Sequence, residues 1–277
     1  MAELSNGKLA SLITEKEAEK CTMSICISTD GLAFFISSSE TSSLLHSDKI
    51  LFAKKDKLSL EGELSELIYN HPFLTYPYQD VTISFPEENF ILIPPGIAIE
   101  GKENLWISSS LILQDDSVGY VATYPINEYG IQLLACWSSK AYSFLRRTYP
   151  YRTIEASIVK QLKEAINSSH KESPLQLFVF IANRHINLIA CHKGTILLAN
   201  KFELAPTLSP QGIADQILFY IGSSLNALNH TASTIEEKLI VLNYTEPLPK
   251  EETQKVALVL QENIPSLGIT YKWSSQQ

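Results

Sequence analysis

The sequence lacks a surplus of positive charge. It contains 22 Lys and Arg residues against 30 Asp and Glu, which gives a formal net charge of −8. Its longest basic clusters are the pairs Lys54-Lys55 and Arg146-Arg147. Because binding to the phosphates of a nucleic acid needs clustered cations, we do not expect nucleic acid among the partners of this protein.

Long apolar runs and paired cysteines are also missing. No run approaches the roughly 20 apolar residues of a membrane span, and the first residues contain no cationic segment that leads into an apolar one. The four cysteines, Cys21, Cys26, Cys136 and Cys191, have no CxxC or metal-type spacing. The last three stand in apolar, strand-like runs, so we expect free thiols that act as small hydrophobes in a cytoplasmic protein. A disulfide pair is the alternative.

Familiar catalytic and metal-binding motifs are absent from the sequence. It contains no GxSxG, HExxH, GxGxxG or GxxxxGK[ST] pattern. His185 and His192 flank residues 186–191, which read as one strand, so they stand at its two ends, a poor geometry for sharing a metal. We therefore predict no metal site.

The clearest pattern begins in the second half of the chain, where three strands precede one long apolar helix. The predicted strands are 177–181, 186–191 and 195–202, joined by the polar hairpin loops 183–185 and 192–194. Ser209 is a helix N-cap and Pro210 the first helical residue. A strand at 238–242, a helix at 251–264 and a strand at 269–273 follow.

The first half has a similar opening. Alternating apolar residues predict strands at 23–28 and 32–37 around a tight turn at Thr29-Asp30-Gly31, where Asp-Gly tolerates the positive φ of a type I′ turn. A Ser/Thr-rich tip separates them from a third strand at 50–54. The remaining predicted elements are a helix with Leu60, Leu64, Leu67 and Ile68 on one face, strands at 80–85, 89–93, 120–125 and 131–137, and helices at 139–149 and 154–166.

Residues 167–174 form a polar run that ends in proline, which is typical of a domain boundary. The sequence thus predicts an N-terminal extension (1–20), a first domain (21–173) and a second domain (174–277). Hairpin strands that lead into helix–strand alternation favour an α/β class, with mixed sheets and helices packed on them.

Four segments resemble a known family: Ile25 to Leu32, Phe90 to Pro94, Leu197 to Phe202, and the helix around Phe219-Tyr220. The chain resembles an uncharacterised bacterial family, a domain of unknown function with an actin-like ATPase fold, over about residues 21–273. The superfamily includes actin, Hsp70, sugar kinases and actin-like pilus-assembly proteins. The resemblance implies tandem duplicated RNase H-like domains around a central cleft. It implies no activity, because that family has no established one.

The resemblance also implies where nucleotide chemistry would lie. The superfamily binds ATP with two hairpin loops around the phosphates and a glycine pair beside the adenosine; acidic residues hold Mg²⁺ and orient water. The first loop falls at Asp30 and Gly31, which keep one carboxylate and one glycine. The second falls at Asn183 and Arg184, with neither glycine nor acid. Asn243 and Tyr244 take the adenosine position, where a tyrosine fills the slot. Two of the three loops are thus unfit for ATP.

The sequence favours a protein without ATPase activity, a pseudoenzyme that acts as a scaffold or adaptor for another protein and needs no cofactor. The alternative is an atypical nucleotide-binding ATPase or kinase-like enzyme that uses Asp30 and Arg184 with ATP and Mg²⁺. A third reading is a two-domain α/β protein unrelated to the superfamily.

Overall fold

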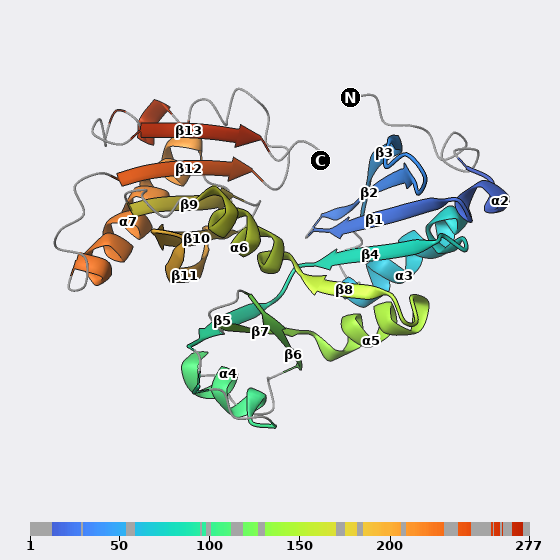
Figure 1. The fold of residues 1–277 in the computed structure, drawn as a ribbon, viewed down its shortest axis with the longest axis horizontal. Coiled ribbons are helices and arrows are strands. Elements are labelled where there is room, and N and C mark those ends of the chain that lie inside the picture. Colours follow the sequence, from blue (N-terminus) through green and yellow to red (C-terminus); the bar gives the residue numbers. More distant parts are fainter. Residues whose placement is uncertain are drawn as a thin grey trace. The chain divides into compact units, whose positions relative to one another are not determined.

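The computed structural model describes residues 13–28, 30–53, 59–94, 96–97, 101–111, 119–126, 131–169, 175–181, 185–205, 209–229, 238–244, 256, 258–260, 262 and 268–273. The chain forms two compact units, which Figure 1 shows as a ribbon: unit 1 is Met1–Glu88, Ile99–Thr123 and Ala135–Ser157, and unit 2 is Asn89–Ala98, Tyr124–Leu134 and Ile158–Gln277. The domain boundary predicted near residue 173 stays a prediction.

Unit 1 contains a five-stranded mixed sheet in the order β3-β2-β1-β4-β8. Its strands are β1 (Cys21–Ile27), β2 (Gly31–Ser38), β3 (Leu44–Leu51), β4 (Asp80–Phe85) and β8 (Thr153–Ala156). The first three pair antiparallel as consecutive hairpins. β4 then joins β1 in parallel and β8 joins β4 in parallel, so the central strand β1 has one neighbour of each direction.

One face of this sheet is more deeply buried than the other. Met23 and Ile25 are buried whereas Ser24 between them is exposed, as the alternating sequence of β1 predicts. The more deeply buried face carries Phe34, whose ring lies 5.0 Å from that of Phe73. The helical elements of this part of unit 1 are α2 (Glu15–Ala18), α3 (Leu60–Asn70), the 3₁₀ turn η1 (Pro72–Thr75) and α5 (Ser139–Thr148).

Unit 2 contains a second five-stranded sheet with the same order and the same strand directions, β11-β10-β9-β12-β13. Its strands are β9 (Leu175–Ile181), β10 (His185–His192), β11 (Thr195–Glu203), β12 (Lys238–Tyr244) and β13 (Gly268–Trp273). Every residue of β9 is buried. A strand buried on both faces reads as a continuous apolar run, which is why β9 does not alternate as β1 does.

The long helix α7 (Pro210–Asn229) confirms the strongest sequence prediction. Ser209 caps it, since its Oγ accepts the N–H of Gly212 at 3.2 Å. Ile217 and Ile221 are buried in one cluster with alternate residues of β9 and β10. The opposite face of the sheet meets α6 (Ser157–Ser168), because Asn187 of β10 donates to Gln161 of α6.

A three-stranded sheet has the order β5-β7-β6. Its strands are β5 (Asn89–Ile93), β6 (Tyr120–Pro125) and β7 (Gln132–Trp137), and α4 (Glu103–Leu111) lies between β5 and β6 in the chain. Trp137 is fully buried, its Nε1 donates to the carbonyl of Phe85 at 3.2 Å, and its ring stacks with that of Phe85. It therefore packs in the core.

Two predicted elements begin at other residues than predicted. β3 begins at Leu44 and not at Ile50, because its register with β2 starts directly after a short turn closed by the Ser38 N–H to the Ser43 carbonyl. The helix predicted from residue 154 begins at Ser157, because Ile154 pairs with Ile83 in the sheet as part of β8. A helix, α4, also forms between residues 93 and 120, where the sequence predicted no element.

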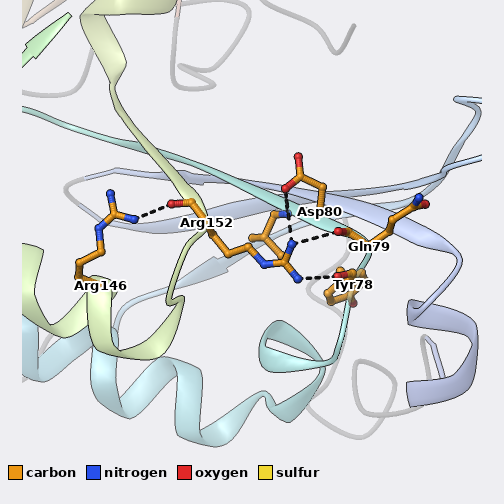
Figure 2. A network of polar contacts seen from close by, with 6 residues as sticks. Tyr78, Gln79, Asp80, Arg146 and Arg152 are labelled. Atoms are coloured by element: carbon orange, nitrogen blue, oxygen red, sulfur yellow. Dashed lines mark hydrogen bonds and ion pairs between the residues drawn. The ribbon is translucent and has the colours of Figure 1, made fainter.

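Arg152 joins β8 to the start of β4 (Figure 2). Its guanidinium donates to the carbonyls of Gln79 at 3.0 Å and Tyr78 at 2.8 Å, and lies 3.6 Å from the carboxylate of Asp80. Arg146 of α5 in turn donates to the carbonyl of Arg152 at 2.6 Å. These bonds fix the chain at the point where α5 ends and the parallel edge strand begins.

We predict that removing one partner of the buried Asn187–Gln161 hydrogen bond lowers the free energy of unfolding more than replacing both partners by leucine. Asn187 Nδ2 donates to Gln161 Oε1 at 2.8 Å, and the two residues are 1% and 8% exposed. Asn187→Leu leaves the Gln161 amide unpaired and lowers the free energy of unfolding by about 1–3 kcal/mol, whereas Asn187→Leu with Gln161→Leu is close to neutral. Urea unfolding of the three proteins measures this difference, and equal losses in single and double variants would contradict it.

Candidate functional site

The first predicted phosphate loop lies between β1 and β2, and its acid is held by its own chain. Asp30 Oδ2 lies 3.0 Å from Lys49 Nζ, and Asp30 Oδ1 accepts the hydroxyl of Ser28 at 2.7 Å. The Ser28 hydroxyl lies 3.1 Å from the carbonyl of Gly31 as well. Both carboxylate oxygens of Asp30 are therefore engaged within the hairpin.

Strand pairing brings Lys49 to this turn. β3 pairs with β2, which places Lys49 opposite Ala33, close to the start of β2. Burial of Asp30 acts to raise its pKa, but the hydrogen bonds from Ser28 and Lys49 outweigh it, so the pKa lies below its ordinary value. Sequence reasoning missed Lys49, because nothing in the local sequence connects it with a turn 19 positions earlier.

Glycine is needed at position 31 because the main chain of β3 lies close to it, and not because the position has a positive φ. Gly31 has no positive φ and belongs to β2, so the predicted type I′ turn of Asp30 and Gly31 is wrong at this hairpin. A Cβ on Gly31 would instead meet the backbone carbonyl of Ile50 in β3. The type I′ geometry occurs in the second unit, where Lys193 and Gly194 have φ values of 52° and 76° between β10 and β11.

The second predicted loop, with Asn183 and Arg184, lies outside the described residues. The strands on either side of it are described, and Ile181 of β9 pairs with Ile186 of β10. His185 opens β10, and burial, followed by the charge of Lys201, lowers its pKa to about 4. This histidine is therefore neutral at pH 7.

Asn243 and Tyr244, the predicted adenosine position, are the last two residues of β12 and do not follow the strand. Their backbones pair with Phe180 and Ile181 of β9 on one side and with Lys272 and Trp273 of β13 on the other. The structure thus brings this position beside the end of β9, the strand that leads into the second loop.

Other sites are scarce in the described ranges. They contain no group of three or more His, Cys, Asp or Glu side chains arranged to hold a metal ion. A hollow of about 540 Å³ lies at the opposite end of β1 from Asp30, and Cys21, Leu45 and His46 are among its lining residues. Across the same residues, we find no helix whose length and apolar character would let it cross a membrane.

The cysteines lie on three strands. Cys21 and Cys26 are on β1, Cys136 is on β7 and Cys191 is on β10; all are free thiols, and all except Cys26 are buried. Burial raises the pKa of the Cys191 thiol to about 12. This thiol stays protonated and packs as a small apolar side chain.

Comparison with known proteins places the chain in a family. The sequence profile described as "Protein of unknown function (DUF3822)" matches residues 11–247. The chain belongs to this family. No curated protein matches the DUF3822 chain by sequence.

Solved structures show the fold of the DUF3822 chain. A Bacteroides thetaiotaomicron VPI-5482 protein, described as having an actin-like ATPase fold and unknown function, aligns with a TM-score of 0.73 at 20% identity over 93% of both chains. A PilM-PilN type IV pilus biogenesis complex aligns with a TM-score of 0.56 at 12% identity over 90% of this chain and 88% of that one. The α/β class and the actin-like ATPase fold that the sequence resemblance implied are confirmed.

We predict that Asp30→Asn lowers the free energy of unfolding by about 1 kcal/mol, because it leaves the half-buried Lys49 ammonium without its partner. The pKa of Asp30 lies below its unfolded value of 3.8, so the ion pair stabilises the protein above that pH and is lost as pH falls through the folded pKa. Urea unfolding at pH 7 and pH 3 measures both effects.

The control for this prediction is Lys49→Met, alone and combined with Asp30→Asn. The double variant should lose less stability than the sum of the two single losses, because the two residues contact each other. Additive losses at pH 7 would show that the two groups do not interact.

We predict that His185 makes the protein less stable in mild acid. Its folded pKa of about 4 lies below the model-peptide value of 6.5, so its contribution to stability is complete above pH 6.5 and declines as pH falls from 6.5 towards 4. His185→Gln should unfold with a shallower pH dependence in this window. Parallel curves for the two proteins between pH 4 and 6.5 would contradict the burial of a neutral imidazole.

Proposed function

We propose that this protein uses its actin-like ATPase fold as a scaffold or adaptor that binds another protein, and that it does not hydrolyse ATP. The observation that carries the proposal is the state of Asp30, whose carboxylate is bonded to Lys49 and Ser28. It is the only acid in the two loops expected at the phosphates. An acid that holds Mg²⁺ or orients water needs an oxygen directed at the ligand, and here both oxygens already have protein donors.

The neighbouring glycine supports the same proposal. A phosphate loop uses glycine so that bare main chain can approach the phosphates. The side of Gly31 without a Cβ faces the carbonyl of Ile50. Glycine at this position is explained by the contact between strands, without any ligand.

The sequence supports the proposal at the other two positions. Asn183 and Arg184 supply neither glycine nor a carboxylate, so a triphosphate would meet side chains and not main chain. Asn243 and Tyr244 stand where the superfamily has a glycine pair, and both are larger than glycine. ATP and Mg²⁺ therefore belong only to the alternative function.

Support for a protein partner comes from the fold. A protein that keeps the actin-like fold without ATP hydrolysis would use the surface of that fold to bind another protein. One structure with this fold is a PilM-PilN complex, an assembly with a second protein. The two sheets share order and directions, which supports the tandem duplication that we include in the proposal; the central cleft and a cytoplasmic location stay predictions.

The nucleotide half of the proposal is tested by thermal unfolding with Mg-ATP and Mg-GTP at millimolar concentration. A ligand present at 100 times its Kd would stabilise the native state by about 2.7 kcal/mol and raise the midpoint by several degrees. We expect no shift. A shift of several degrees that disappears in Asp30→Asn would overturn the proposal.

The partner half is tested by purifying the chain from its native cells under mild conditions and measuring the mass of the complex in solution. We expect a second polypeptide in stoichiometric amount. A chain that migrates at its own mass or as a multiple of it, with no other polypeptide, would contradict the adaptor role.

The alternative function, an atypical nucleotide-binding enzyme, has one observation in its favour. Lys49 places a cation at the predicted first phosphate loop, and an ammonium can bind a phosphate as a point charge. Under this alternative, Lys49→Met abolishes a nucleotide-induced shift of the unfolding midpoint, whereas under our proposal there is no shift to abolish.

A further inference from the structure

We draw no further inference here: the strongest candidate, the surface turn between α5 and β8 where Tyr151 is fully exposed at a φ of 63° near Arg146 and Arg152 in the chain, carries none, because both arginines are already bonded to main-chain carbonyls and nothing in the structure shows what covers the tyrosine ring.

Discussion

Each sheet depends on the parallel pairing of its central strand with a strand far along the chain. β1 joins β4 and β9 joins β12, and in both cases two hairpin strands and a helix lie between the partners along the chain. A parallel pair needs a crossover connection, usually through a helix. Once this pairing is made, the hairpin strands occupy one side of the central strand and the later strands occupy the other.

The two sheets use this order with different surroundings. β9 is buried along its whole length, whereas β1 alternates between buried and partly exposed residues. α7 and α6 contact the second sheet on opposite faces, so its central strand β9 is buried on both faces and is almost continuously apolar. β1 therefore carries polar residues on the face that is less covered by helices. Its alternation does not indicate a less stable strand.

The contact between Asp30 and Lys49 stabilises the first hairpin. The bond links the β1–β2 turn to β3, and the close approach of Gly31 to Ile50 links the same two regions through main chain. A carboxylate and a glycine that serve a hairpin in this way have a reason to be present without nucleotide. The proposed scaffold role rests on this engagement of Asp30 by its own chain.

Elements with local signals could be predicted from the sequence. The cap at Ser209, the helical spacing of Ile217 and Ile221, and the Lys193-Gly194 hairpin all depend on residues within a few positions of one another. The resemblance then gave the actin-like fold, and the residue types at the expected loops gave the candidate site. Tertiary structure alone decided that Ile154 belongs to a strand, that β3 begins at Leu44, and that Lys49 binds Asp30. These outcomes depend on partners that pack from distant parts of the chain, and such pairing leaves no periodic or spacing signal in the local sequence.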